Sequence, residues 1–348
     1  MSADVLSDVL AAVRLTGAVF FDFELSSPWV AEAPPAREVA HLVMPGVQRV
    51  IEFHLLARGS CWGAMVGGEP IRLEEGDVLG FPQGHAHVLS SAPGMRARPR
   101  PSMYTRSSAP LPVCYEMGGG GRERARIVCS FLGCDDRPFN PLLSALPPVL
   151  HIPASSRSGT AAWLGTLLDG AAREARDQQP GSENVLARLS ELMFVESIRH
   201  HLGSLTSAES GWLAGLRDPL VGRALAALHG EATAPWTVER LARRVGASRS
   251  VLAERFAALV GLPPMQYLAL WRMQLASRLL LDGGAVAEVA AAVGYESEAA
   301  FARAFKKLVG RSPGSWRGSR SRATAGGLAA KPPARPRAGR PPSRAALS

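Results

Sequence analysis

The chain has 348 residues, 47% of them hydrophobic, yet no apolar run approaches the roughly 18 residues of a membrane-spanning helix, which predicts a globular protein of two or three domains. The N-terminus lacks a basic segment followed by an apolar one, so we expect no signal peptide, no membrane partner and a cytoplasmic protein. The net charge of +9 is concentrated in the C-terminal half: residues 1–211 hold 18 Lys/Arg against 22 Asp/Glu, whereas residues 212–316 hold 13 against 8. A polyanion should therefore bind the C-terminal half.

Residues 18–152 have the sequence pattern of a β domain, with short apolar stretches separated by Gly- and Pro-rich turns every 8 to 12 residues. This pattern predicts an antiparallel barrel or sandwich. The expected strands are Val50–Leu56, Cys61–Val66, Glu69–Leu73, Asp77–Phe81 and His87–Ser90.

Within this region, Gly76 is followed by Pro82-x-Gly84 and then by His87. The proline stiffens a corner, and Gly84 permits a left-handed turn into the next strand. The spacing resembles the second cupin motif, and the resemblance implies a cupin-like sensor domain over residues 1–152.

Metal-binding cupins also carry His-x-His and a carboxylate in their first motif, but the corresponding strands here read Glu52-Phe53-His54-Leu55 and Ser60-Cys61-Trp62-Gly63. A three-histidine site is incomplete, so we expect no metal and no cofactor. His54 and His87, with His85 as a substitute and Glu52 nearby, could still meet across neighbouring strands. A small-ligand pocket is favoured over a metal site or a purely structural barrel, with Trp62 as its aromatic wall or as a core residue.

Four cysteines, Cys61, Cys114, Cys129 and Cys134, show no Cys-x-x-Cys spacing, which indicates reduced thiols packed as small apolar groups. A redox switch using a pair of them, such as Cys61 and Cys129, requires an exposed thiol of lowered pKa. The sequence cannot show either property.

Residues 94–126, with alternating arginines and prolines and a run of four glycines, fit no strand and are interpreted as a long mobile loop. Residues 153–211 then predict a helical hairpin and linker. Thr160–Gln178 and Glu183–Leu202 each carry an apolar face, and Pro180-Gly181-Ser182 forms the turn between them. This hairpin packs on the barrel or forms a homodimer.

The C-terminal half contains the same helix-turn-helix pattern twice, at about residues 237–261 and 285–310. The copies superimpose residue by residue across both helices, with one residue added in the second turn. Between them, residues 265–282 read as one helix, started by two prolines and ended by two glycines. The equivalent pairs are Val238 and Val286, Leu241 and Val289, Val245 and Val293, Gly246 and Gly294, Phe256 and Phe305, and Pro264 and Pro313.

The second copy resembles the signature of the AraC/XylS transcription regulators. The matching positions are Ala290, Val293-Gly294-Tyr295, Ser297, Phe301, Arg303, Phe305-Lys306, Gly310 and Ser312-Pro313. Trp316 departs from the family's Tyr or Phe but keeps an aromatic packing residue. The resemblance covers residues 212–317 and implies two recognition helices in successive major grooves of double-stranded DNA, roughly 34 Å apart. It also favours dimerisation and a cupin-type sensor ahead of the DNA-binding unit.

The outward faces of the two recognition helices differ. We expect Arg303 to read guanine and Glu254 to accept from cytosine or orient Arg249 or Arg255; a salt bridge within its own helix is the alternative for Glu254. The expected base contacts are Ser250, Glu254, Ala299 and Arg303. The expected phosphate contacts are Ser248, Arg249, Ser297, Lys306 and Lys307.

Residues 318–348 form a basic tail rich in Pro and Arg that cannot bury a core and is expected to be disordered. The whole sequence thus predicts an α+β multidomain transcription factor, responsive to an unknown small-molecule effector and acting with RNA polymerase. The competing hypotheses are a cupin metalloenzyme fused to a DNA-binding domain and a nucleoid-binding protein indifferent to sequence. The sequence leaves open the effector, the operator, and whether transcription rises or falls.

Overall fold

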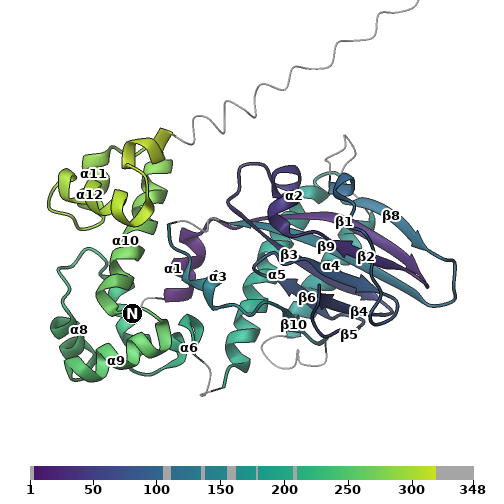
Figure 1. Cartoon of the computed structure of the whole chain (residues 1–348), viewed down its shortest axis with the longest axis horizontal. Coiled ribbons are helices and arrows are strands. Elements are labelled where there is room, and N and C mark those ends of the chain that lie inside the picture. The colour runs from purple at the N-terminus through teal and green to yellow at the C-terminus, as the bar shows by residue number, and fades with distance from the viewer. Residues whose placement is uncertain are drawn as a thin grey trace, which may run out of the picture.

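The computed structural model describes residues 4–104, 111–134, 138–154, 162–177, 179–206 and 210–318. Within them the chain forms a sheet-rich N-terminal part and an all-helical C-terminal part, which lie side by side (Figure 1). The predicted α+β class and the order of the two parts are confirmed. The expected disordered tail lies outside the described residues from residue 319 onward.

Two sheets form the N-terminal part. The larger has the strand order β10-β6-β3-β9-β1-β8, and the smaller has the order β2-β7-β4-β5. The larger sheet contains β1 (Thr16–Ser26), β3 (Arg49–Arg58), β6 (Val78–Phe81), β8 (Val113–Gly118), β9 (Arg124–Cys134) and β10 (Leu150–Ile152). The smaller contains β2 (Val30–Ala33), β4 (Ser60–Met65), β5 (Ile71–Glu74) and β7 (His87–Ser90). All five strands predicted from the sequence are present.

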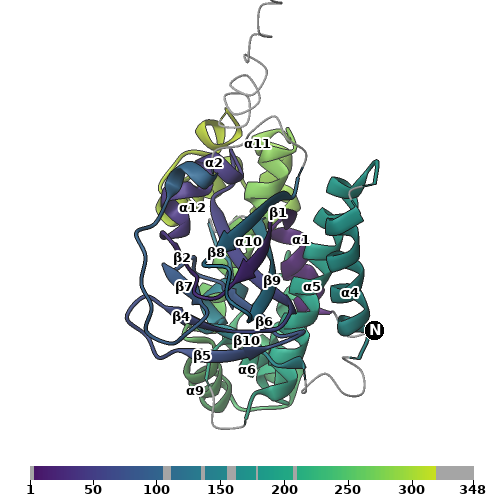
Figure 2. The same ribbon diagram turned by 90° about the vertical axis from the view of Figure 1, so that its right-hand side faces the viewer.

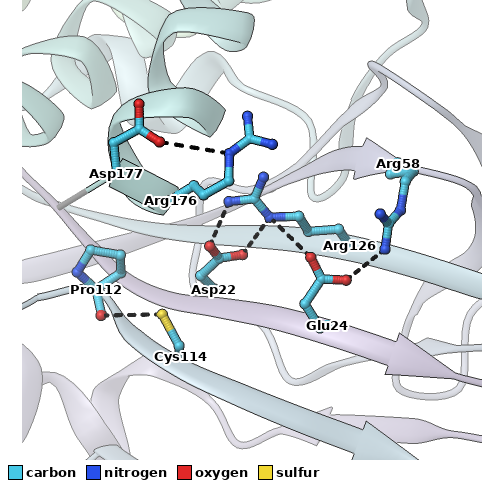
Figure 3. Close-up of polar contacts among 8 residues, drawn as sticks. All are labelled: Asp22, Glu24, Arg58, Pro112, Cys114, Arg126, Arg176 and Asp177. Carbon is cyan, nitrogen blue, oxygen red and sulfur yellow. Dashed lines mark hydrogen bonds and ion pairs between the residues drawn. The ribbon is translucent and has the colours of Figure 1, made fainter.

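Strand β1 alternates between two environments, because successive side chains of a strand point to opposite faces. Asp22 and Glu24 lie on the outer face of the sheet, where Arg126 of β9 pairs with both (Figure 3). The guanidinium group donates from Nε and Nη2 to the two carboxylate oxygens of Asp22 at 3.0 and 2.6 Å. This buried, bidentate ion pair fixes the register of β1 against β9. The inner face carries Phe21, Phe23 and Leu25.

The predicted helical hairpin is present as α4 (Ala162–Asp177) and α5 (Ser182–Ser204), and α5 packs across β1 and β9 (Figure 2). The approach is close at Gly17, where a Cβ atom would lie 2.3 Å from the carbonyl oxygen of Ala187. The backbone N–H of Gly17 also donates to Glu191 at 3.1 Å. A glycine is therefore required at this helix–sheet contact.

Both predicted helix-turn-helix units are present. The first consists of α8 (Val238–Val245) and α9 (Arg249–Val260), and the second of α11 (Val286–Ala292) and α12 (Glu298–Val309). They follow α6 (Trp212–Arg217) and α7 (Val221–Gly230), and α10 (Pro264–Leu281) runs between them (Figure 1). The turns pass through Gly246 and Gly294, whose φ angles of 71° and 81° are left-handed and favour glycine.

The buried side chains show how these parts are joined. One continuous core runs from the outer face of the larger sheet, through Ile51 and Phe194, into the first helix-turn-helix unit at Leu241 and Phe256. The second unit has a core of its own, which includes Phe305 and is closed by the aromatic residue at position 316. We expected a domain boundary between residues 211 and 212. The segments on either side of this position share one hydrophobic core.

A short N-terminal helix, α1 (Val5–Ala12), was not predicted. It lies between α10 and the sheets (Figure 1) and precedes β1 directly. Gln274 and Arg278 of α10 donate to the carbonyl oxygens of Ala12 and Ala11 at 3.1 and 2.8 Å. Arg14 forms an ion pair with Asp282 at 2.6 Å. This N-terminal arm therefore ties the sensor half to the DNA-binding half.

Two expectations are wrong. Residues 94–126 are not one loop, because they contain the short helix η1 (Pro101–Tyr104), strand β8 and the start of β9. The sheet is also not wholly antiparallel, because β8 pairs with β1 in parallel.

Two further helices, α2 (Ala36–Val43) and α3 (Pro141–Ala145), lie beside the sheets. Among the described residues, no helix has the length and apolar character needed to cross a membrane.

Candidate DNA interface and effector cavity

Helix α9, the second helix of the first unit, buries Leu252 and Phe256 and presents the opposite face to solvent. Ser250 and Glu254 are exposed on that face. Among the described residues, Glu254 has no ion-pair partner, so the alternative of a salt bridge within its own helix is not observed. The carboxylate is free to meet an external hydrogen-bond donor.

The two arginines of α9 are held by other carboxylates. Arg249 pairs with Glu239 of α8 at 2.8 Å, and Arg255 donates from Nε and Nη2 to Asp218 at 2.8 and 2.5 Å. The expectation that Glu254 orients one of these arginines is therefore wrong. Both side chains remain largely exposed, so they can still face phosphates, but neither extends freely from the helix.

Sequence reasoning missed Val251, in the first turn of α9, which is 52% exposed. The residues of a recognition helix nearest its N-terminus are those that contact base edges. An exposed β-branched residue next to Ser250 was a signal present in the sequence, because the inward stripe leaves this position outside the core. Helix α9 therefore presents a hydroxyl, a carboxylate and an apolar side chain.

Helix α12, the second helix of the second unit, presents a different surface. It buries Phe301 and Phe305 and exposes Ala299, Arg303 and the lysines at positions 306 and 307. Within the described ranges, none of these three cations forms an ion pair. Helix α12 thus offers unpaired positive charge, whereas both arginines of α9 are paired.

Ser248 and Ser297 are the N-caps of the two recognition helices. Their Oγ atoms accept from the backbone N–H groups of Val251 and Ala300 at 3.3 and 3.2 Å. Capping uses the hydroxyl as an acceptor, so the hydrogen of Ser297 remains available to a phosphate oxygen, and the Ser248 hydroxyl also shares a 3.3 Å hydrogen bond with that of Ser250.

A cavity of about 270 Å³ lies between the two sheets. Its walls are mainly apolar and come from both sheets and from η1, while Arg98 and Arg100 stand at its rim. The apolar lining comprises Phe21, Phe23, Leu25, Trp29, Leu89, Met103, Tyr104, Met117, Ile127 and Phe131. Enclosed apolar pockets with a few polar groups are the usual form of a small-molecule site.

A cluster of buried polar groups lines one end of the cavity and consists of Glu52 and His54 of β3, His87 of β7 and Cys129 of β9. His54 Nε2 lies 2.7 Å from His87 Nε2, and His54 Nδ1 lies 3.0 Å from the Sγ atom of Cys129. Glu52 Oε2 is 3.8 Å from His87 Nε2, and neither oxygen of this carboxyl has a hydrogen-bond partner. The expected meeting of these side chains across strands therefore occurs.

The hydrogen positions follow from one fixed contact. His87 Nδ1 lies 2.9 Å from the carbonyl oxygen of His85, which can only accept, so Nδ1 carries the hydrogen. Neutral His87 then accepts at Nε2 from His54 Nε2–H, and His54 Nδ1 accepts from the thiol of Cys129. One directed chain of hydrogen bonds runs from the thiol to the backbone.

Burial sets the charge of this cluster. It lowers the pKa of His87 to about 4, and burial and the neighbouring His87 lower that of His54 well below its ordinary value. Burial raises the pKa of Glu52 to about 8. At neutral pH both imidazoles are therefore neutral, which is the form that binds metals, and the carboxyl holds a proton unless a cation is near.

Four residues that the sequence analysis assigned to a ligand pocket or a redox pair do not take those roles. Trp62 lies on the opposite face of β4, where the guanidinium group of Arg72 sits 6.0 Å from its ring, so it is not a wall of this cavity. The His85 side chain is exposed, and only its carbonyl oxygen reaches the cluster. Burial raises the pKa of the Cys61 thiol to about 12 and that of Cys129 as well, which is opposite to the lowered pKa that redox sensing needs.

Two imidazole nitrogens and one carboxylate could hold a metal ion. One ligand atom from each of Glu52, His54 and His87 lies within 4.8 Å of the others. The set replaces a histidine of the metal-binding cupin pattern with a glutamate, and its chemistry fits zinc or iron(II). The sequence argument placed Glu52 near the two histidines but judged the site by its histidine count, whereas the structure offers Glu52 as the third ligand.

Comparison with known proteins agrees with this architecture. A cupin family model matches residues 4–203, and a helix-turn-helix domain model matches residues 241–319. A putative AraC-like transcription regulator of Streptomyces lividans is 35% identical over 272 residues, which are 77% of this chain and 87% of that protein. The transcriptional regulator AlkR of Acinetobacter baylyi is 31% identical over 265 residues, 76% of this chain and 86% of that protein.

The chain belongs to the AraC-like transcription regulators. It is a DNA-binding regulator with a cupin sensing domain, and the naming of its relatives as regulators implies a role other than catalysis. Among solved structures, the DNA-binding domain of AdpA in complex with a target DNA is 34% identical and covers 30% of this chain and 96% of that chain, with a TM-score of 0.29.

Proposed function

We propose that this AraC-like regulator changes its DNA binding when a small effector occupies the cavity between the sheets. The observation that supports this most directly is the continuity of the chain. Strand β1 supplies Phe21 and Phe23 to the cavity wall, and the same strand continues backward into α1, which bonds to α10 between the two helix-turn-helix units.

The effector should be small and mainly apolar, with one polar group. The cavity volume and its aromatic walls favour such a molecule, and the buried cluster around His54 and His87 offers hydrogen-bonding partners at the inner end. A ligand there pushes on β1, whose outer face is fixed to β9 by Arg126 and to α5 by Gly17. Movement along the strand axis therefore reaches α1.

On DNA, the two recognition helices lie in successive major grooves. Arg303 pairs with guanine, Glu254 accepts from cytosine N4, and Val251 packs on the methyl group of a thymine. Ser250 and Ala299 approach bases between these contacts. The N-cap serines at 248 and 297, together with Arg249, Lys306 and Lys307, contact phosphates.

The regulator acts as a homodimer in the cytoplasm, where its DNA target and RNA polymerase lie. Val185 and Leu192 of α5 are 46% and 45% exposed, and their spacing of seven residues places them on one helix face. Such a stripe on the outer face of the hairpin suits a second copy of the same helix. RNA polymerase is the partner through which bound regulator alters transcription.

A cavity-filling variant tests the effector response. Leu25→Trp adds an indole to the cavity wall, whereas Val66→Trp adds one at an exposed position outside it. With a reporter driven by the operator and cells supplied with candidate effectors, Leu25→Trp should abolish the response and Val66→Trp should keep it. A full response in both variants would place the effector outside this cavity.

A charge on the outer stripe tests the dimer. Leu192→Glu in the full-length chain should shift sedimentation at micromolar concentration from dimer to monomer. Leu279→Glu, on a residue that is 38% exposed on α10, is the matched control and should remain dimeric. Equal masses for both variants would remove α5 from the dimer contact.

A further inference from the structure

The inner end of the cavity contains an arrangement that the regulator role alone does not require. Glu52 is 1% exposed, and both of its carboxyl oxygens lack a hydrogen-bond partner. Burying a polar group without a partner costs on the order of 1 to 3 kcal/mol, and a charged one costs more. Such a group in a native structure requires an explanation, and a bound ion that completes it is one.

The neighbours of this carboxyl identify what completes it. His54 and His87 direct their Nε2 atoms toward each other and toward Glu52, and the three ligand atoms lie within 4.8 Å of one another. No arginine or lysine lines this end of the described cavity, since Arg98 and Arg100 stand at the rim. A compact cation that binds nitrogen and oxygen together fits the space, whereas an organic cation does not satisfy both imidazoles.

We propose that Glu52, His54 and His87 bind one divalent transition-metal ion, zinc or iron(II), at the inner end of the sensor cavity. Magnesium and calcium are excluded because they prefer oxygen ligands, and copper(I) because it prefers sulfur. To hold one ion through both Nε2 atoms, the two imidazoles would give up the 2.7 Å hydrogen bond between them and move slightly apart. This inference goes beyond the proposed effector response and does not depend on it.

The contacts behind the ligands support the site. The carbonyl oxygen of His85 holds the hydrogen of His87 on Nδ1, which leaves Nε2 free to bind an ion. When His54 binds through Nε2, its hydrogen moves to Nδ1, where the Sγ atom of Cys129 at 3.0 Å accepts it. Cys129 is thus a positioning residue behind His54, and its sulfur does not contact the ion.

The test uses the full-length protein after treatment with a chelator, with zinc and cobalt(II) added separately as the metal alone. We expect one ion per chain by titration calorimetry and elemental analysis. Cobalt should give a visible absorption band without a strong thiolate charge-transfer band. Zinc should raise the melting temperature. These readouts need neither DNA nor effector, so their failure leaves the proposed function standing.

Variants locate the ion. Glu52→Gln replaces an unpartnered carboxyl with an amide of the same size and should fold, but it should bind zinc more than about 100-fold more weakly. His41→Gln, at an exposed histidine outside the cavity, is the control and should bind as the wild type does. Cys129→Ala should weaken binding about tenfold and shift the cobalt band, and Cys129→Ser should restore part of both.

Two results would overturn the proposal. One is a wild-type chain that takes up no stoichiometric ion, and the other is equal zinc affinity in Glu52→Gln and His41→Gln. Because zinc stabilisation of the wild-type chain is measured independently, a variant that fails to fold does not prevent a decision.

Discussion

The two helix-turn-helix units share one sequence pattern but are attached to the molecule in different ways. The first has a core continuous with the sensor domain, through Phe256 and its neighbours, and α1 packs against the adjoining α7. The second has its own core around Phe305 and is connected through α10. Their reading faces differ too, since the arginines of α9 are paired and Arg303 of α12 is not. The two copies of the motif therefore have different roles. The first is coupled to the sensor domain, and the second reads bases with unpaired cations.

The largest expected effect comes from matched core deletions. Phe256→Ala and Phe305→Ala each remove a fully buried ring and should each cost about 3 to 5 kcal/mol. Native-state hydrogen exchange should show that Phe305→Ala loosens α11 and α12 only, while Phe256→Ala also loosens α1 and α3. Loss of protection confined to α8 and α9 in Phe256→Ala would show that the first unit is as independent as the second.

A smaller effect separates base reading from charge. Arg303→Ala should weaken binding to the cognate site by about 1 to 3 kcal/mol and relax preference at one or two base pairs. Lys307→Ala should weaken cognate and scrambled DNA about equally and reduce the salt dependence. Affinities on both DNAs at two salt concentrations measure this. Equal losses on both DNAs for Arg303→Ala would remove that residue from base reading.

Acid should destabilise the helices around His229 and leave the second unit unaffected. His229 of α7 stacks on Trp271, lies 2.8 Å from the Tyr267 hydroxyl and has its Nδ1 atom 3.5 Å from Asp8 of α1. Burial lowers its pKa from 6.5 to about 3, so below pH 6.5 the unfolded chain binds a proton that the folded chain does not. The stabilisation is complete above pH 6.5 and is lost as the pH falls toward 3.

Between pH 7.5 and 5.5 this histidine should therefore cost about 1 kcal/mol of unfolding free energy. Urea unfolding of the full chain at both pH values measures it, and His229→Gln should lose less stability over the same interval. Residues 285–318 contain no histidine, so exchange protection in α11 and α12 should not change. An identical pH slope in the variant would assign the effect to other groups.

The smallest effect concerns Val251. Replacing the contacted thymine with deoxyuridine removes one methyl group and should lower wild-type affinity about threefold, close to the value of one buried methylene. Each thymine of the half-site bound by α9 is replaced in turn. Val251→Ala should lose the distinction between thymine and deoxyuridine, whereas Val66→Ala, at an exposed position of the sensor domain, should keep it. A wild-type chain that never distinguishes the two bases would remove Val251 from the interface.

The local signals explain how much of the fold could be predicted. The two units were visible because glycines and aromatic residues recur at one offset, and α10 because prolines and glycines bound it. Strand β8 was missed because glycines and prolines on both sides hide a six-residue strand that pairs with β1 in parallel. Helix α1 has only eight residues, too short to stand out, and its stability comes from packing on α7 and α10.

In the candidate sites, too, only the features that depend on local sequence patterns could be predicted. Exposure of Arg303, Glu254 and Ser250 followed from helical periodicity, because the buried stripe leaves them outside. The pairing of Arg255 with Asp218, 37 residues away, depends on tertiary packing that no local pattern contains. Likewise, Glu52 and His54 share a strand face by their spacing, but only the position of β7 in the second sheet brings His87 to them.

Selection of bound fragments from random DNA by the full-length chain tests the central claim most directly. Two units reading successive major grooves with different chemistry should enrich two blocks of sequence, with centres about 10 to 10.5 base pairs apart. The block read by α12 should be the sharper, with a guanine that disappears in Arg303→Ala. Enrichment of a single block, or of none, would contradict the account.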